Sequence, residues 1–485
     1  MVAWETALTT RDTNRVVRPL EWGFDWLEGT LPWGERVGSE VGGREAGFPA
    51  SAPLRAASGR NDTVEAGRDF GRKGTDPGTA SGIAPGTGLG TASGIDSGIA
   101  LGIAPGTTST AVVEADELER MVALNEAIVA RAGEFFSYER PTDFRLEMRH
   151  PQLFPTNVRP ETLEQDAEFK RMAREGVLEE AEFLRFTSPV RTRFPENDVV
   201  NARWYPAPKQ TAEDKAKRGT KPKQAGKNKP KQAERNKPKQ AIIVLPQWNA
   251  DAFSHNALCT LFNRFGISAL RLSKPYHDIR RPAELERSDY AVSANVGRTI
   301  EACRQAAVDI RCCIDWLEQQ GYEQFGVLGT SLGSCYAFIA AAHDPRIQVC
   351  AFNHASTWFG DVVWTGQSTR HIRQAFEEAG LTQETVRKIF TGISPMSYMD
   401  QFAASKSRRT LVVHATWDLT FLQEFSLDVL KNFDRCGVNY ESRVLPCGHY
   451  TTGEAPYKYI DGWYLGSFVY RAFKKLAEEA IPSQS

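Results

Sequence analysis

Ser331, Asp418 and His449 follow one another along the chain in an order that suits nucleophilic catalysis. A serine hydroxyl attacks poorly at neutral pH until an imidazole takes its proton, and the imidazole needs a carboxylate to fix its tautomer. Ser331 lies in a Gly-Thr-Ser-Leu-Gly motif at 329–333, directly after an apolar run at 324–328. An ordinary glycine turn is the other interpretation of such a motif. The context favours a sharp strand-to-helix turn that lifts the hydroxyl above a sheet, so we expect Ser331 to be the nucleophile.

The acid is expected just past a buried strand. Residues 409–415 form an apolar run that predicts such a strand, and Asp418 follows its carboxyl end. We therefore expect the Asp418 carboxylate to orient the base. Two alternatives stay open: Asp418 caps the following helix, or the acid is Glu424 or Asp428.

The base is expected after the next strand. Residues 440–445 predict a strand that runs into Gly448 and His449, and His449 is the only histidine that follows Asp418 in the sequence. A nucleophile on this kind of turn is followed along the chain by the acid and then by the histidine, which makes His449 the candidate base. The histidines that precede the acid, His354 among them, are interpreted as core or surface residues.

Residues 186–473, which carry these three motifs, resemble the serine-hydrolase branch of the α/β-hydrolase superfamily, and in particular uncharacterised bacterial α/β-hydrolase-domain proteins. The resemblance implies an eight-stranded, mostly parallel sheet flanked by helices, with catalysis at the carboxyl ends of the strands. Apolar runs that alternate with helical periods predict a parallel α/β sheet as well. A long helix is expected at 296–320, and the expected strands are 185–190, 199–205, 241–245, 268–272, 324–328, 349–353, 410–415 and 440–445.

An oxyanion needs hydrogen-bond donors, and each such donor typically contributes about 3 to 4 kcal/mol of barrier stabilisation. The resemblance implies that one donor is the amide of Leu332 and that the other comes from the loop at 245–251. Relatives often carry His-Gly before an aromatic residue there, whereas this chain has Pro246-Gln247 before Trp248. The second donor is therefore either the Trp248 or the Gln247 amide. A plain connection with Trp248 packed in the core is the structural alternative.

A basic loop at 274–282 follows the fourth expected strand, at the sheet edge where open α/β sheets bind ligands. It is similar to a Pro-Tyr and Arg-x-Pro segment of one bacterial and eukaryotic subset of uncharacterised α/β-hydrolase-domain proteins. Tyr276, Arg280 and Arg281 are candidate substrate contacts, because an arginine pairs well with a carboxylate or a phosphate. A solvated pair of arginines is the alternative interpretation.

The segment 356–405 is rich in aromatic residues and lies between two expected strands, where relatives carry a cap over the active site. Trp358 and Phe359 are candidate contacts for an apolar acyl chain or an aromatic ester. Packing within the cap itself is the alternative. No CxxC or HExxH pair occurs in the sequence, so we expect neither a metal nor a cofactor.

The chain of 485 residues exceeds one α/β core. We expect an N-terminal segment, 1–36, that packs on a hydrolase domain at 111–485. Between them, 37–110 is a glycine-rich, repetitive insert that cannot repay its ordering entropy by burial and should be disordered. A Lys/Pro-rich insert at 209–240 repeats Lys-Pro-Lys-Gln-Ala three times and is expected to be a solvated loop, with nucleic-acid binding as a weak alternative.

A formal net charge of −1 gives no global field that favours nucleic acid or an anionic membrane. The sequence opens without a charged and then apolar leader, and no run reaches the roughly 20 apolar residues of a membrane span. Eight cysteines in so long a chain do not form a disulfide framework. We therefore expect a cytoplasmic protein without stable membrane insertion, and its oligomeric state is left open.

The function that these expectations favour is hydrolysis of a small ester-type substrate, with an acyl-enzyme intermediate on Ser331. Esterases, lipases, thioesterases, peptidases and acyltransferases share the same three side chains, so the sequence does not choose among them. The contrasting hypothesis is a non-catalytic binding or scaffold protein with the same fold.

Overall fold

The structure is a computed structural model and describes residues 1–10, 15–28, 31–32, 115–149, 151, 171, 180–208 and 238–480. The predicted glycine-rich insert at 37–110 lies outside the described residues, as does most of the Lys/Pro-rich insert at 209–240. Within the described part, helices and strands alternate from residue 240 onward, as the apolar pattern predicts.

One sheet of nine strands forms the centre of the fold, in the order β1-β2-β3-β5-β4-β6-β7-β8-β9. The pairs from β5 through β4 to β9 are parallel, whereas β1, β2 and β3 form antiparallel pairs at one edge. The strands are β1 Arg145–Arg149, β2 Ala181–Thr187, β3 Val199–Tyr205, β4 Gln240–Leu245, β5 Ser268–Ser273, β6 Gln324–Thr330, β7 Ile347–Asn353, β8 Arg409–Ala415 and β9 Tyr440–Leu445.

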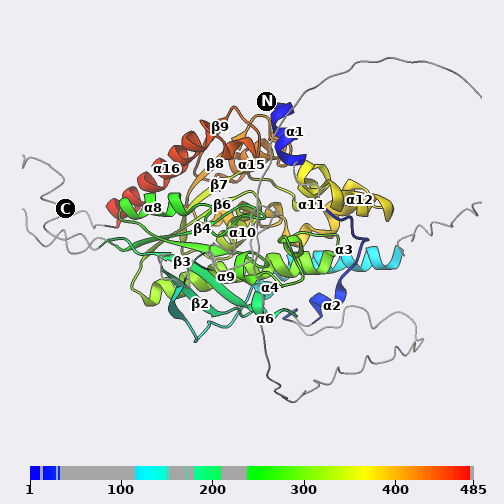
Figure 1. The fold of residues 1–485 in the computed structure, drawn as a ribbon, viewed down its shortest axis with the longest axis horizontal. Coiled ribbons are helices and arrows are strands. Elements are labelled where there is room, and N and C mark those ends of the chain that lie inside the picture. Colours follow the sequence, from blue (N-terminus) through cyan, green and yellow to red (C-terminus); the bar gives the residue numbers. More distant parts are fainter. Residues whose placement is uncertain are drawn as a thin grey trace, which may run out of the picture. The chain divides into compact units, whose positions relative to one another are not determined.

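Helices cover both faces of this sheet (Figure 1). The α-helices are α1 Val2–Thr10, α2 Phe24–Leu27, α3 Ala115–Ala130, α4 Ala132–Phe135, α6 Pro195–Asp198, α8 Asn256–Arg264, α9 Val296–Gln319, α10 Leu332–Ala342, α11 Phe359–Thr365, α12 Arg370–Glu378, α13 Gln383–Ile389, α14 Met399–Ala404, α15 Gln423–Cys436 and α16 Tyr457–Glu479. Short 3-10 turns are η1 Asp278–Arg280, η2 Asp289–Ala291, η3 Gln367–Thr369, η4 Thr391–Ile393, η5 Pro395–Tyr398 and η6 Thr451–Gly453.

The two faces of the sheet bury two separate apolar cores, because successive side chains of a strand point to opposite faces. In β4, Ile243 packs with residues of α9 and α10, whereas its neighbours Ile242 and Val244 pack with α8 and α16. A strand buried on both faces is apolar throughout rather than alternating, which is the pattern that made 241–245 recognisable. In Figure 1, α8 and α16 lie together on the side opposite α9.

The predicted fold class is confirmed: the chain folds into a mostly parallel sheet flanked by helices, and each of the eight expected strands has a counterpart. Two differences concern the antiparallel edge. The first expected strand, 185–190, begins four residues earlier as β2, and β1 was not predicted because its Arg-Leu-Glu-Met-Arg sequence is mostly charged. β1 is the edge strand and β2 is its neighbour, and their half-exposed positions weaken the apolar pattern.

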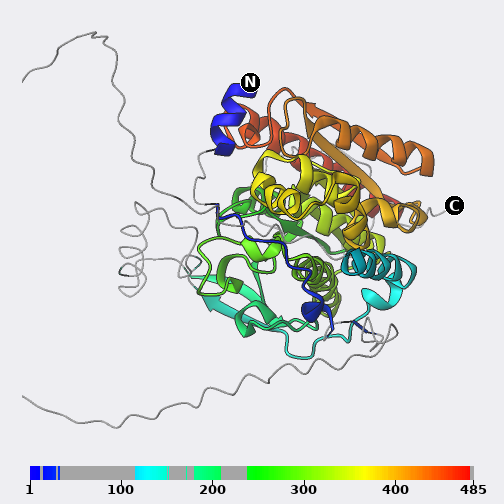
Figure 2. The same ribbon diagram turned by 90° about the vertical axis from the view of Figure 1, so that its right-hand side faces the viewer.

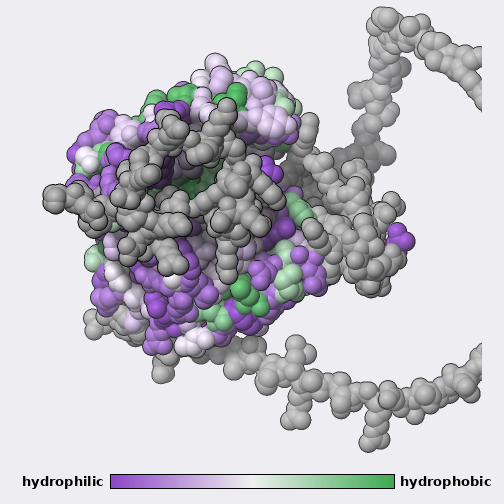
Figure 3. Space-filling view, turned by 90° about the vertical axis from the view of Figure 1, so that its left-hand side faces the viewer, coloured by the Kyte–Doolittle hydropathy of each residue, from purple (hydrophilic) through white to green (hydrophobic). Residues whose placement is uncertain are grey.

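The segment 356–405 folds into the helices α11 to α14. This segment packs against α3, which is more than 200 residues earlier in the sequence. Figure 2 shows α3, in cyan, beside these yellow helices, and α3 contacts α13 and η4. The part of the face in Figure 3 that is not covered by grey atoms is largely hydrophilic, with small, separate hydrophobic groups. Within the described residues, no helix combines the length and the apolar character that crossing a bilayer requires.

Candidate active site

Ser331 lies on the turn between β6 and α10, with φ 57° and ψ −121°. Non-glycine residues rarely adopt positive φ, and such strain is typical of functional positions. Both motif glycines are needed for the turn: a Cβ on Gly329 would lie 2.1 Å from the Gly333 carbonyl oxygen, and one on Gly333 would lie 2.5 Å from that of Leu245. The sequence motif therefore forms the sharp turn that was predicted for it.

The three residues expected to act together are brought into direct contact. His449 Nε2 lies 3.0 Å from Ser331 Oγ, and His449 Nδ1 lies 2.8 Å from Asp418 Oδ2. Asp418 follows β8 and His449 follows β9, so two parallel strands deliver the pair to one sheet edge. Because a carboxylate only accepts hydrogen bonds, Nδ1 carries the proton and Nε2 is left to accept the serine proton. Neither Glu424 nor Asp428 occupies the acid position.

The Asp418 carboxylate is buried and fully hydrogen-bonded. Its Oδ1 accepts the backbone amides of Thr420 and Phe421 at 2.8 and 2.7 Å, and its Oδ2 accepts two imidazoles. Burial alone would raise the pKa of Asp418, but His449 and His354 lower it by charge and by hydrogen bonding and outweigh burial. Asp418 is therefore ionised at neutral pH.

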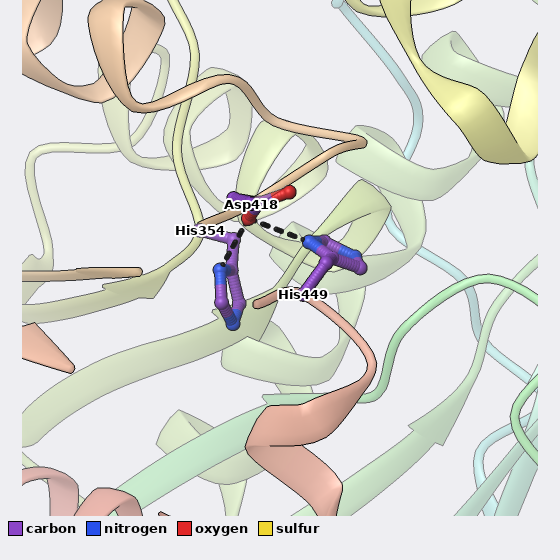
Figure 4. Close-up of side chains that lie close together, drawn as sticks. All are labelled: His354, Asp418 and His449. Carbon is purple, nitrogen blue, oxygen red and sulfur yellow. Dashed lines mark hydrogen bonds and ion pairs between the residues drawn. The ribbon is translucent and has the colours of Figure 1, made fainter. Parts of the chain in front are cut away.

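The second imidazole belongs to His354, which the sequence analysis interpreted as a core or surface residue. His354 Nδ1 lies 2.8 Å from the same Asp418 oxygen that accepts His449, and Figure 4 shows both rings directed at that carboxylate. Potential ligand atoms of the three residues lie within 4.8 Å of one another, which is close enough to consider a metal. The two hydrogen bonds to one oxygen account for the arrangement without one. His354 was missed because chain order excluded it as the base.

The protonation of His449 depends on this neighbourhood. Burial by itself would lower the pKa of His449, but the Asp418 carboxylate raises it by charge and by hydrogen bonding, and Glu5 adds to the effect. His354 has a lowered pKa, mainly because it is buried and also because His449 is near. The ring of Phe421 stacks on His449 at 5.4 Å and restricts its orientation. The site thus favours the doubly protonated, cationic form at His449 rather than at His354.

The loop after β4 lies against the turn and presents free amides. The amides of Gln247, Trp248 and Leu332 donate to no group in the part of the chain that the structure describes. Gln247 and Trp248 line a cavity together with Ser331, and Leu332 lines a second cavity with Ser331 and Trp248. These amides remain the candidate oxyanion donors, and the choice between Gln247 and Trp248 stays open.

Two buried residues of the basic loop hold that β4 loop in place. Lys274 Nζ donates to the Gln247 carbonyl at 3.0 Å, and His277 Nε2 accepts the Asn249 amide at 3.2 Å. Burial lowers the pKa of both side chains well below their usual values. His277 is therefore a neutral hydrogen-bond acceptor, and both side chains tie the β4 loop to the basic loop.

The candidate substrate contacts in the basic loop do not reach either cavity. Arg280 has no exposed surface and pairs with the equally buried Asp309 at 2.8 Å. Arg281 is 8% exposed and donates to the Glu286 carbonyl, and Tyr276 is fully buried between the rings of Phe194 and Tyr290. The expectation of substrate contacts is corrected accordingly. The two arginines of this basic loop point into the protein, where the Asp309 carboxylate pairs with Arg280 and the Glu286 carbonyl accepts a hydrogen bond from Arg281.

Ser331 borders two cavities of different character. One, of about 1520 Å³, is lined by Ser331, His449 and polar as well as aromatic side chains, including Asn353, Asp461 and Trp463. The other, of about 50 Å³, is almost wholly apolar, and its walls include Phe359, Val362, Val363, Leu332 and Phe421. Phe359 therefore lines the same small cavity as Ser331. Trp358 lines neither cavity and packs under the Arg387 guanidinium.

Asp461 is a further site residue that the sequence analysis did not identify. It lines the large cavity from α16, and its Oδ2 accepts a bond from Asn353 Nδ2 at 2.9 Å. Burial raises the pKa of Asp461 to about 7. A single aspartate in an amphipathic helix gives no sequence signal of this kind.

Residues 303–461, which contain the serine, the aspartate and the histidine, match the model of the prolyl oligopeptidase family. A stretch of 106 residues is 31% identical to an uncharacterised 31.7 kDa protein of Escherichia coli from the traX-finO intergenic region. That match covers 20% of this chain and 36% of the Escherichia coli protein.

Solved structures similar to this chain include acetyl xylan esterases. The enzyme of a Paenibacillus species is 12% identical with a TM-score of 0.42, and the match covers 72% of this chain and 95% of that one. Acetyl xylan esterase 1 of a Thermoanaerobacterium species is 13% identical with a TM-score of 0.44, over 74% and 99%. The acylaminoacyl peptidase of Pyrococcus horikoshii is 12% identical with a TM-score of 0.39, over 61% and 46%. The chain has the α/β-hydrolase fold, as its sheet order and serine turn indicate.

Proposed function

We propose that the chain is a serine hydrolase that cleaves a carboxylic ester with a small acyl group. The observation that carries the proposal is the continuous hydrogen-bonded line from Asp418 through His449 to Ser331. A strained turn, an ionised acid and a histidine with its Nε2 toward the hydroxyl are the elements that an activated serine needs. The family match over 303–461 supports the same class of chemistry.

The geometry supports a two-step reaction. Ser331 Oγ attacks the acyl carbon while His449 Nε2 accepts its proton, and the amide of Leu332 with that of Trp248 or Gln247 stabilises the oxyanion. His449 then returns the proton to the leaving alkoxide, which departs as the alcohol and leaves an acyl-serine. Water, deprotonated by His449, attacks the acyl-serine, and the carboxylic acid leaves with Ser331 restored. Asp418 stays ionised throughout and stabilises the imidazolium.

The small apolar cavity sets the expected acyl length. One buried water needs about 10 to 15 Å³ of comparable volume, so a cavity of about 50 Å³ accommodates about three to five non-hydrogen atoms by that measure. An acyl group of two to four carbons fits, whereas a long fatty acyl chain does not. The larger cavity, with its mixed polar and aromatic lining, suits the alcohol part of the ester.

A series of p-nitrophenyl esters from acetate to decanoate tests this proposal. We expect kcat/KM to be highest for acetate to butyrate and to fall for longer chains. Ser331→Ala should reduce kcat about 10⁶-fold without changing the fold, and thermal unfolding of the variant provides the control. A folded wild-type chain without activity on any ester, or an active Ser331→Ala variant, would favour the non-catalytic binding protein instead.

Peptide hydrolysis is the second candidate, because the matching family model is that of prolyl oligopeptidases. The same three side chains serve both reactions, and the leaving group decides between them. The measurement is the ratio of kcat/KM for p-nitrophenyl acetate and for N-blocked prolyl p-nitroanilide. A ratio in favour of the anilide would replace the ester proposal with a peptidase.

A further inference from the structure

Helix α1, at the beginning of the chain, lies against the loop that carries His449. Glu5 in α1 has no exposed surface, and its two carboxylate oxygens accept the amides of Tyr450 and Thr451 at 2.7 and 3.0 Å. These are the two residues that directly follow His449. A carboxylate that accepts two backbone amides forms charge-assisted hydrogen bonds, which are the stronger class in proteins.

Glu5 packs so closely against Gly448 that no side chain fits at position 448. A Cβ on Gly448 would lie 2.3 Å from Glu5 Oε2, so the residue before His449 has to be glycine as long as Glu5 occupies its place. A hydrogen bond within the loop joins residues on either side of His449, because Thr451 Oγ1 accepts from the Gly448 amide at 2.6 Å. His449 is thus flanked on both sides by residues that Glu5 touches.

Helix α1 also reaches the other wall of the cavity. Thr9 Oγ1 lies 3.1 Å from Gln367 Oε1 in η3, which belongs to the segment 356–405, and Leu8 lines the large cavity beside the catalytic side chains. Contacts of α1 with both η3 and η6 agree with this bridging position. The helix therefore connects the His449 loop to the wall that faces it.

We propose that Glu5 is a positioning residue, which holds the His449 loop so that Nε2 stays within proton-transfer distance of Ser331 Oγ. This inference rests on the proposed serine-hydrolase function and adds a distant residue to its machinery. A histidine on a loop is only as well placed as that loop, and a displacement of about 1 Å can cost about 10²-fold in rate. Glu5 acts through the loop backbone and does not touch the reacting atoms.

A second consequence gives an independent readout. The charged and titratable groups that act on His449 in the described residues are Asp418, Glu5 and His354. Asp418 and Glu5 both raise the pKa of His449, so neutralising Glu5 lowers that pKa. The acid limb of the pH–rate profile then moves to lower pH, which loss of packing alone does not produce.

The test compares Glu5→Ala and Glu5→Gln with Ala7→Gln, a matched change at an exposed position of the same helix. We expect Glu5→Ala to lower kcat about 10- to 100-fold with little change in KM. Glu5→Gln keeps one oxygen acceptor and should lose less, and Ala7→Gln should match the wild type. Hydrogen exchange of peptides covering 448–453 should become faster in the two Glu5 variants, whether or not an ester is turned over.

The outcomes separate this inference from the proposed function. Rates are referred to active sites titrated with a fluorophosphonate probe, so that partly unfolded protein does not count. If the Glu5 variants melt at lower temperature but keep the kcat and the pH profile of the wild type, the positioning role is overturned and the contact is only structural. If exchange at 448–453 responds to Glu5 but the wild type neither hydrolyses esters nor reacts with the probe, the proposed function fails and the positioning role fails with it.

Discussion

Two polar segments at the same edge of the sheet place their side chains in opposite ways, one inside the protein and one at the candidate active site. The loop after β5, at 274–282, buries its lysine, histidine and arginine among protein partners, whereas the loops after β8 and β9 bring Asp418 and His449 next to Ser331. Both segments look functional in the sequence. The two segments differ in the partners of their side chains. Arg280 pairs with the Asp309 carboxylate of α9, whereas His449 contacts the Asp418 carboxylate through one ring nitrogen and the Ser331 hydroxyl through the other.

The protonation of the two buried histidines shows the same contrast. Burial lowers the pKa of His277 well below its usual value, the nearby Lys274 lowers it further, and His277 serves as a neutral acceptor. Asp418 reverses the effect of burial on His449 and raises its pKa. A buried histidine at this edge therefore becomes a candidate base only where an acid offsets the effect of burial on its pKa.

Asp418→Asn is the change expected to have the largest effect. The amide cannot accept from both imidazoles and stabilise an imidazolium, so kcat should fall about 10⁴-fold. Steady-state ester hydrolysis measures the loss, and circular dichroism checks the fold. A loss below tenfold would mean that Glu424 or Asp428 serves as the acid.

Arg280→Met removes one partner of a wholly buried ion pair and leaves Asp309 uncompensated. Breaking such a pair typically costs about 3 to 5 kcal/mol of unfolding free energy, and urea denaturation measures it. We expect kcat and KM per folded molecule to stay at the wild-type level. A selective rise of KM for an anionic ester would restore Arg280 as a substrate contact.

Lys274→Met tests whether the basic loop at 274–282 supports the loop after β4, which carries the candidate oxyanion donors Gln247 and Trp248. The variant loses the bond to the Gln247 carbonyl but keeps the length of the side chain. We expect kcat to fall about tenfold, since a misplaced donor weakens oxyanion stabilisation, while KM changes equally little for neutral and anionic esters. Unchanged kcat would remove the loop from the account of catalysis.

The pH dependence gives the smallest expected effect. His449 has to be neutral to accept the serine proton, so kcat/KM rises as pH rises through the pKa of His449. Because that pKa is raised, we expect the midpoint of the acid limb to lie above the usual 6.5 of a histidine. Asp418, whose pKa is lowered, stays ionised over this range and adds no second step near neutrality. A midpoint below 6.5 would contradict the carboxylate contact.

The sequence predicts strands β4, β6, β7 and β8 well because they are buried on both faces and therefore apolar over most of their length. The same physics explains the failure at β1, whose charged residues lie at an exposed edge. Ser331, Asp418 and His449 follow from chain order and strand ends. His354 and Glu5 do not, because their contacts with the site join positions 64 and 445 residues apart, and no local pattern encodes such pairs.

Labelling with a fluorophosphonate probe, followed by peptide mapping, tests most directly whether three distant side chains activate one hydroxyl. The account predicts a single adduct on the peptide that contains Ser331 and no adduct in Ser331→Ala, with slow labelling of a His449→Gln variant that keeps the wild-type fold. A folded wild-type chain that leaves Ser331 unlabelled, or an adduct that persists after Ser331→Ala, would contradict it.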